Sequence, residues 1–134
     1  MNRFLQRLFG VPIVLVLAIS SQSTLFAQGV EFVREQYDKA EYLVPMRDGV
    51  KLFTIVYAPK DRSREYPIIL FRTPYSVGPY GPASYRASLG PSADFARDGF
   101  IFVYQDVRGQ FKSEGVFVVM RPIIAEKRDA SQTD

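Results

Sequence analysis

The sequence predicts an α/β fold in which an antiparallel hairpin forms the edge of a sheet that continues into parallel strands. Three observations support this prediction. The segment 50–59 is rich in β-branched and aromatic residues, and a turn signal separates it from a first strand expected over 41–46. The segments 68–71 and 100–106 are short apolar runs, as expected of buried strands. Between them, 92–99 has the pattern of a short helix, which completes a strand–helix–strand unit.

The predicted hairpin depends on Asp48 and Gly49, because Asp-Gly pairs favour the tight turns that join antiparallel strands. Pro45 lies in the first strand and has no N–H to donate, so this strand is expected at the edge of the sheet. The preceding residues 28–40 are polar with scattered apolar positions, and they fit either a short helix or an extended lead-in.

The two later strands are expected to be covered on both faces, because successive positions in 68–71 and 100–106 are apolar. Gly and Pro recur through 76–91, which predicts a long loop between them. The segment 116–120 is apolar and extended, and it fits either a short extra strand or a buried loop segment.

The helix predicted over 92–99 begins at Ser92 or Pro91 and ends at Gly99, which serves as a left-handed cap. One short helix leaves one face of a sheet of four or five strands largely bare. Parallel sheets are almost never stable in that condition. We therefore expect residues 28–134 to be the front of a longer protein, or to pair with something that covers the sheet.

The N-terminus has the pattern of a secretory signal peptide over residues 1–27. Arg3 and Arg7 form a short basic region, 8–19 is an apolar core, and cleavage is expected after Ala27. An apolar run of this length is shorter than the roughly 20 residues that a membrane span needs, so no stable span is expected. The protein is expected to be secreted or periplasmic, and an uncleaved anchor is the alternative.

Composition excludes several functions for these residues. Without the two arginines of 1–27, 15 of the 17 basic residues remain against 14 acidic ones, so nucleic-acid binding is not expected. The remaining charges alternate in sign, as on a solvated surface. Cysteine is absent, which excludes disulfides and thiolate chemistry, and histidine is absent, which excludes a complete Ser-His-Asp triad. No metal site, phosphate loop or cofactor site is predicted.

Several blocks of the sequence together resemble one enzyme family. They extend from about Glu41 to Pro122 and are VPMRDGVKLFTIVYAPK, YPIILFRTPYS, FARDGFIFVYQDVRGQFKSEG and VFVVMRP. The family is the α/β-hydrolase group that contains cocaine esterase, the α-amino acid ester hydrolases, the glutaryl acylases and the Xaa-Pro dipeptidyl-peptidases. The blocks MRDGVKL and QDVRGQFKSEG look most like the amino acid ester hydrolase branch.

The resemblance implies a serine hydrolase whose nucleophile lies in a G-x-S-x-G elbow after the next strand, with the acid and histidine later still. No such elbow occurs in this sequence, and Ser113 lies in a loop without that context. The resemblance therefore implies that 28–134 is the N-terminal part of an α/β-hydrolase domain, Xaa-Pro dipeptidyl-peptidase-like, truncated before the nucleophile.

The resemblance implies one catalytic residue within this chain. The tyrosine of the family's R-x-P-Y block donates its hydroxyl to the oxyanion hole, and the matching residue is Tyr75. Its position fits that role, because it follows a strand at the carboxyl edge, where α/β sheets bind ligands. Pro74 fixes one backbone angle, and Thr73 before it favours extended geometry. A surface turn residue is the alternative interpretation of Tyr75.

Other polar and aromatic candidates have structural interpretations. Asp106 and Arg108, with Gly109, are expected to form a knot that caps backbone donors and bridges loops, rather than to contact substrate directly. Tyr80 and Tyr85 are expected in a mobile loop, with a pocket lining as the alternative. The acids Asp94 and Asp98 of the predicted helix are not expected to form a catalytic carboxylate pair.

The expected function is that of the N-terminal fragment of a secreted serine hydrolase that cleaves ester or amide bonds of small molecules by acyl transfer. The fragment is expected to be inactive alone, whereas the full-length protein would be an enzyme. The alternative is a non-catalytic secreted module or truncated relic that binds a partner through an open sheet edge. The reading frame beyond Asp134 separates the two.

Overall fold

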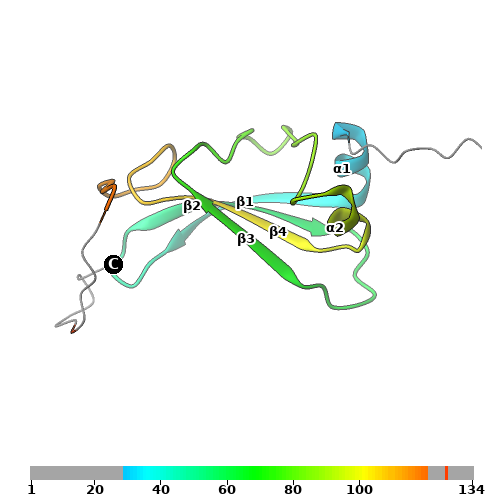
Figure 1. Ribbon diagram of the computed structural model, residues 1–134, viewed down its shortest axis with the longest axis horizontal. Coiled ribbons are helices and arrows are strands. Elements are labelled where there is room, and N and C mark those ends of the chain that lie inside the picture. The colour runs from blue at the N-terminus through cyan, green and yellow to red at the C-terminus, as the bar shows by residue number, and fades with distance from the viewer. Residues whose placement is uncertain (1–28, 121–125, 127–134) are drawn as a thin grey trace, which may run out of the picture.

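In the computed structural model, which describes residues 29–120 and 126, one mixed sheet of four strands carries two short helices on one side (Figure 1). The strand order is β1-β2-β4-β3, so β4, the last strand in the described part of the chain, lies inside the sheet. The elements, in chain order, are α1 Val30–Gln36, β1 Tyr37–Pro45, β2 Lys51–Pro59, β3 Ile68–Thr73, α2 Ala93–Arg97 and β4 Ile101–Asp106.

The N-terminal hairpin forms as predicted, with β1 and β2 paired from Tyr37↔Pro59 to Pro45↔Lys51. Gly49 adopts φ +83° in the turn, a left-handed conformation that glycine accepts without strain. β1 is an edge strand of the described sheet, so the missing N–H of Pro45 does not remove a hydrogen bond between two inner strands. The lead-in contains both predicted alternatives, since α1 runs directly into the strand at Tyr37.

The strand–helix–strand unit is also confirmed, because β3 and β4 pair in parallel from Ile68↔Ile101 to Thr73↔Asp106. β4 also pairs antiparallel with β2, which joins the unit to the hairpin. Ser92 is the N-cap of α2, and Gly99 follows the helix with φ +81°. A Cβ atom at Gly99 would lie 2.6 Å from the ring of Tyr66, so the close approach also requires glycine.

The core lies between the sheet and the elements on its upper side in Figure 1. α1, α2 and the segment between β3 and α2 bury apolar residues against β2 and β4. Buried tyrosine hydroxyls find backbone partners there: Tyr37 donates to the carbonyl of Ala96 at 2.7 Å, and Tyr104 accepts from Gly90 N–H at 2.9 Å. The buried members of this cluster are Val33, Tyr37, Phe53, Ile55, Tyr57, Val77, Leu89, Ala96, Phe102 and Tyr104.

The opposite face of the sheet is bare at its two edge strands in the described part of the chain, while Thr54 and Gln105 on the inner strands are buried. On β3, Ile68 is 65% and Leu70 is 53% exposed, and Tyr42 on β1 is 53% exposed. The prediction of one largely bare face is therefore confirmed for these residues. The prediction that the third strand is covered on both faces is wrong for the described residues. Ile69 and Phe71 pack on the core, but no described element covers the face that carries Ile68 and Leu70.

The apolar segment after β4 is neither a strand nor buried. Val116 to Met120 are exposed, with Val119 at 83% and Met120 at 86%, so both sequence interpretations of 116–120 are wrong. The backbone of Val116 and Phe117 lies against Gly109 of the loop after β4, while much of the side-chain surface of the segment faces outward. The predicted signal peptide, 1–27, lies outside the described residues. Among the helices that the structure describes, none is long and apolar enough to cross a membrane.

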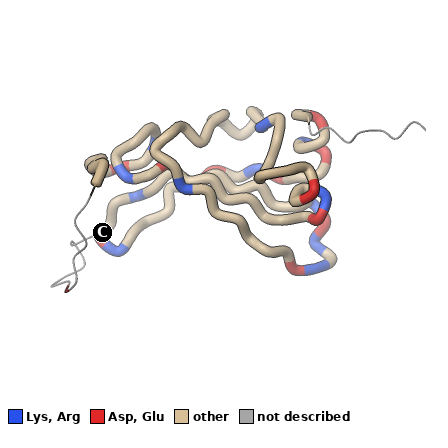
Figure 2. The backbone as a smooth tube through the Cα atoms, viewed as in Figure 1, with Lys and Arg blue, Asp and Glu red and all other residues tan. Residues whose placement is uncertain are grey.

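Charged residues of both signs alternate around the end of the molecule that carries α1, α2 and the β2–β3 loop (Figure 2). Several are paired, as in Arg62 with Asp38 at 3.0 Å and Arg34 with Glu31 at 3.7 Å. Such exposed pairs contribute little to stability. The polar candidates at the opposite end of β3 and β4 differ, because several of them are buried.

Candidate active site

The candidate site lies where β3 and β4 end side by side. Thr73 and Asp106 are the last paired residues of the parallel strands, and Val107 N–H donates to the Thr73 carbonyl at 3.2 Å. The chain leaves both strands at this edge, in green after β3 and in yellow to orange after β4 (Figure 1). Two loops from distant parts of the sequence therefore meet at the carboxyl edge, which is where α/β sheets commonly bind ligands.

Asp106 joins these two loops. Its side chain is fully buried, and its carboxylate accepts hydrogen bonds from Val77 N–H at 3.1 Å, the Tyr80 hydroxyl at 3.0 Å and Lys112 N–H at 3.4 Å. Its own carbonyl accepts from the Ser113 hydroxyl at 2.7 Å. The buried carboxylate thus accepts hydrogen bonds from both loops, which compensate for its removal from water. These contacts agree with the structural knot predicted for Asp106.

Arg108 bridges the loop after β4 to the hairpin turn. Its guanidinium lies 2.8 Å from the Asp48 carboxylate, and the hydrogen bond from Arg108 holds the pKa of Asp48 below its usual value. Gly109 adopts φ +71°, and a Cβ atom there would lie 2.1 Å from the backbone nitrogen of Phe117. The bridging role predicted for Arg108 is confirmed, but the sequence showed only turn chemistry at Asp48 and gave no sign of this partner.

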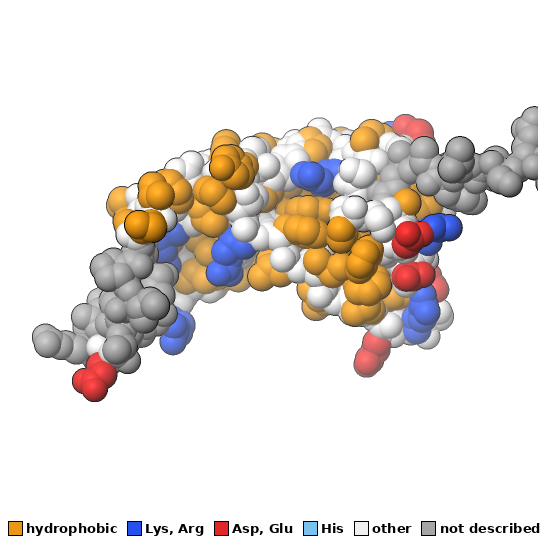
Figure 3. All heavy atoms as spheres, viewed as in Figure 1, with side chains coloured by type: hydrophobic (Ala, Val, Ile, Leu, Met, Phe, Trp, Pro, Cys, Tyr) orange, Lys and Arg blue, Asp and Glu red, His pale blue; other side chains and the backbone are white. Residues whose placement is uncertain are grey.

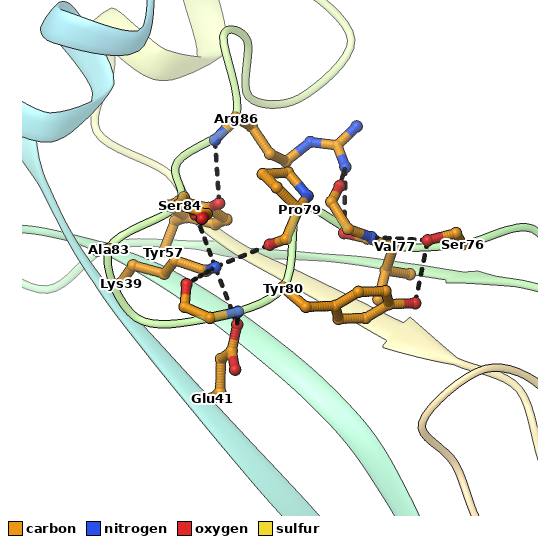
Figure 4. Close-up of polar contacts among 12 residues, drawn as sticks. Lys39, Glu41, Tyr57, Ser76, Val77, Pro79, Tyr80, Ala83, Ser84 and Arg86 are labelled. Carbon is orange, nitrogen blue, oxygen red and sulfur yellow. Dashed lines mark hydrogen bonds and ion pairs between the residues drawn. The ribbon is translucent and has the colours of Figure 1, made fainter.

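The loop 76–91 is tied to the hairpin by a buried ammonium group (Figure 4). The Lys39 side chain has no exposed surface, and its Nζ donates to three loop carbonyls, those of Pro79, Gly81 and Ser84, each at 2.8 Å. Its fourth partner is the Glu41 carboxylate at 2.9 Å, which also accepts from Gly81 N–H at 2.7 Å. Both side chains lie on one face of β1, two residues apart.

The aromatic residues of this loop pack against the sheet. The Tyr80 ring meets Phe53 edge-on at a centroid distance of 5.4 Å, and the Tyr85 ring meets Tyr57 at 6.0 Å. Arg86 adds a second tie, with its guanidinium donating to the Val77 carbonyl at 3.2 Å. The sequence predicted a mobile loop here, but the structure gives it contacts that hold it against the core.

Tyr75 lies at the start of the same loop, two residues after the end of β3. Its side chain is 79% exposed, and its N–H donates to the Thr73 hydroxyl at 3.1 Å. This hydrogen bond joins the residues on either side of Pro74 and so restrains the backbone there, while the Tyr75 ring extends outward. This local hydrogen bond is typical of Ser and Thr in turns, and it was not foreseen from the sequence.

The described serines at this edge are not arranged as nucleophiles. Ser76 donates to the Tyr80 hydroxyl at 3.0 Å, and Tyr80 in turn donates to Asp106. Burial, followed by the hydrogen bond to Asp106, raises the pKa of Tyr80, so it remains a neutral donor and cannot take a proton from Ser76. The Ser113 hydroxyl is engaged by Phe53 N–H at 2.8 Å and by the Asp106 carbonyl.

The remaining acid candidates lie on α2, away from this edge. Asp94 pairs with Arg97 on its own helix, and the Asp98 carbonyl accepts from Arg64 at 3.0 Å. The Asp94 carboxylate is thus engaged within its own helix, away from the edge where β3 and β4 end. What this edge of the sheet offers chemically is a rigid frame, built around Asp106, that presents the exposed phenol of Tyr75.

Comparison with known proteins shows what this frame resembles. The sequence matches the family described as X-Pro dipeptidyl-peptidase (S15 family) over residues 48–133. Among curated proteins, it is 38% identical over 91 residues to cocaine esterase from Rhodococcus sp. (strain MB1 Bresler). That match covers 68% of this chain but only 15% of the esterase.

Two solved structures share the fold. An aminopeptidase from a marine sediment archaeon, Thaumarchaeota archaeon, superposes with a TM-score of 0.57 and 36% identity over 74% of this chain and 17% of its own. An α-amino acid ester hydrolase superposes with a TM-score of 0.55 and 32% identity over 85% of this chain and 18% of its own. The chain thus spans less than a fifth of the length of each of these relatives.

Proposed function

This chain belongs to the X-Pro dipeptidyl-peptidase (S15) family of hydrolases, and from that premise we propose that it is the N-terminal part of a serine hydrolase that cleaves ester or amide bonds. The proposal is supported by the family match, by two related solved structures with hydrolase names, and by the α/β-hydrolase type of its sheet. The observation that carries it furthest is the exposed Tyr75 at the carboxyl edge of the parallel strands.

The proposed role of Tyr75 is to donate its hydroxyl to the substrate carbonyl oxygen as that oxygen becomes negatively charged. Its exposure leaves the phenol free to reach a ligand, while Thr73 and Pro74 fix the backbone that carries it. A single preorganised donor of this kind lowers the barrier to acyl transfer by roughly 3–4 kcal/mol. The second donor would be a backbone N–H beside the nucleophile.

The nucleophile, the acid and the base are proposed to lie outside residues 1–134 in the full-length protein. The chain contains no histidine, so it holds no base for a Ser-His-Asp mechanism. The segment 1–27 is proposed to direct export, which would place the enzyme outside the cytoplasm. The substrate is proposed to be a small ester or amide, and hydrolysis by acyl transfer needs no cofactor.

The substrate class can be tested on the full-length protein with a matched panel. Xaa-Pro amides and α-amino acid esters are compared at equal concentrations, because relatives of both kinds occur in the family. We expect faster turnover of the amino esters, whereas faster turnover of Xaa-Pro amides would count against this branch. A reading frame that stops after Asp134 would instead favour a non-catalytic module with a partner on its open sheet edge.

The oxyanion role is tested by Tyr75→Phe in the full-length protein, which removes one hydroxyl and keeps the ring. We expect kcat/KM for every hydrolysed substrate to fall by about two orders of magnitude. Tyr42→Phe is the matched control, because Tyr42 is another exposed tyrosine but lies on β1, on the far side of the sheet. A fall of less than about threefold for Tyr75→Phe would exclude the oxyanion role.

A further inference from the structure

Phe111, in the loop after β4, has an unusual conformation. Its φ is +48°, and among the described residues it is the only non-glycine with a positive φ. Left-handed backbone is unfavourable for a bulky side chain, and a residue held there deserves a functional hypothesis. The ring is also 56% exposed, so burial of its own surface does not repay the strain.

The surrounding loop fixes this conformation. Gly109 N–H donates to the Glu114 carbonyl at 2.9 Å, so the loop closes across Phe111. Ser113 N–H donates to the Gln110 carbonyl at 3.0 Å, and Lys112 N–H reaches the Asp106 carboxylate at 3.4 Å. Hydrogen bonds on both sides of Phe111 therefore impose the left-handed backbone, and the ring is held outward by its frame.

The side chains of this loop are arranged against their usual preference. The ammonium of Lys112 lies over the Tyr80 and Phe53 rings, 4.6 Å and 4.9 Å from their centroids, while the neighbouring Phe111 ring remains exposed. A charged group packs on aromatic surface, and the aromatic group faces outward. This inversion presents an apolar surface where a polar one would be favoured for solubility alone.

The position of this apolar surface connects it with the proposed oxyanion donor. Asp106 accepts from Val77 N–H, two residues after Tyr75, and from Lys112 N–H, one residue after Phe111. One buried carboxylate therefore fixes the two exposed aromatic residues relative to each other. Figure 3 shows hydrophobic side chains gathered at the end of the molecule where, in Figure 1, the loops after β3 and β4 lie.

We propose that Phe111 is a specificity-determining residue whose ring binds an aromatic group of the substrate attached on one side of the scissile carbonyl. The inference rests on the proposed hydrolase function and adds a substrate class to it. Tyr75 would hold the carbonyl oxygen, and Phe111 would contact the aromatic group beside it. The aromatic group belongs either to the acyl part or to the leaving group, and the two are separated by experiment.

The test uses the full-length protein and four substrates: phenylacetyl and acetyl esters, each with a benzyl and with an ethyl leaving group. The variants are Phe111→Ala, Phe111→Gly and, as a control, Val119→Ala at another exposed apolar position. We expect Phe111→Ala to lower kcat/KM about tenfold either for the phenylacetyl esters or for the benzyl esters, whichever aromatic group the ring binds. For the acetyl ethyl ester the decrease should be less than about twofold.

Phe111→Gly separates recognition from stability. Glycine accepts φ +48° without strain, so the melting temperature should stay equal or rise while the preference for the aromatic arm is still lost. If the ring instead packs against another part of the full-length protein, both variants lower the melting temperature and reduce all four substrates equally, which overturns the proposal.

The outcomes also separate this inference from the function on which it rests. Suppose that the full-length protein hydrolyses the esters, and that Phe111→Ala prefers benzyl over ethyl and phenylacetyl over acetyl to within about twofold of the unmodified enzyme. Only the role of Phe111 is then overturned. If the full-length protein hydrolyses no ester or amide at all, both proposals are overturned together.

Discussion

At the scale of single residues, Asp106 has the largest effect on the shape of the candidate site. Its position after an apolar strand predicted a capping role, and the structure shows which donors it caps. The sequence did not show that one of these donors, Val77, follows Tyr75 by two residues, because a hydrogen bond between residues 29 positions apart leaves no local pattern. The positive φ of Phe111 could not be predicted either, because phenylalanine rarely adopts it and no neighbouring residue signals it.

We expect Asp106→Asn to lower the free energy of unfolding by about 2–3 kcal/mol, because the amide weakens the charge-assisted hydrogen bonds and turns an N–H₂ toward donors. Urea denaturation of the protein measures the change. Asp94→Asn on α2 is the control, since Asp94 is exposed and its pair with Arg97 lies on one helix turn. Equal effects of the two substitutions would contradict the role of Asp106.

A second residue-scale prediction concerns Gly109. Gly109→Ala should cost roughly 2–4 kcal/mol or prevent folding, because the added Cβ meets the Phe117 backbone at 2.1 Å. Two glycine controls separate the causes: Gly49→Ala has a positive φ but free space, and Gly29→Ala has free space only. The unfolding energies should fall in the order Gly29, Gly49, Gly109, and a Gly109 variant as stable as the Gly49 variant would exclude the clash.

At the scale of elements, the loop 76–91 shows where sequence reasoning stops. Its Gly and Pro content predicted a loop correctly, but its attachment depends on Lys39 and Glu41, which resemble ordinary charged residues of an edge strand. Their spacing of two does place them on one face of β1. What the pattern does not reveal is that this face is covered by a segment 40 residues later in the chain.

Lys39→Met tests the attachment of this loop. Removing the ammonium leaves three carbonyls and the Glu41 carboxylate without their donor, so we expect a loss of roughly 3–5 kcal/mol in unfolding free energy. Lys51→Met, at an exposed position of β2, should change stability by less than about 0.5 kcal/mol. Similar melting curves for both variants would show that the buried ammonium does not hold the loop.

The Glu41 carboxylate of the same cluster makes the stability of the protein depend on pH. Burial alone would raise the pKa of Glu41, but hydrogen bonds from Lys39 and Gly81 outweigh it and lower the pKa below its usual value. Because the folded pKa is lowered, its contribution to stability is complete above the ordinary glutamate range and is lost as the pH falls through the lowered pKa.

Denaturant midpoints measured from neutral to acid pH test this sign. The difference between the unmodified protein and Glu41→Gln should shrink as the solution becomes acidic, while Glu65→Gln, at an exposed position, should leave the profile unchanged. A difference that stays constant across the acid range would contradict the assignment of this titration to Glu41.

At the scale of the whole molecule, the sequence predicted the fold class, the hairpin and the parallel pair, because each depends on short-range patterns and turn residues. It did not predict the strand order, in which β4 lies between β2 and β3. Nor did it predict that the apolar residues 116–120 lie exposed, since an apolar run indicates burial without showing what covers it. The bare sheet face was predicted because one short helix is too small to cover both faces of a sheet of four or five strands.

We expect residues 28–134 expressed alone to hydrolyse none of the ester or amide substrates, because no histidine is present to act as base. A fluorophosphonate probe, which labels activated serines, should label the full-length protein and leave the isolated segment unlabelled. Full-length protein carrying Tyr75→Phe serves as a control with an intact nucleophile and slower labelling. Labelling of the isolated segment would show that one of its own serines is activated after all.

The strand order has a consequence for synthesis of the chain on the ribosome. The hairpin is complete once Pro59 has emerged, but among the described strands β3 pairs only with β4, so this pairing waits until Asp106 has emerged. At ~5–20 residues per second this interval is on the order of seconds. During that time the segment Ile68–Thr73 presents an apolar strand whose backbone groups are not yet paired. We therefore expect association of nascent chains to be a risk until β4 inserts beside it.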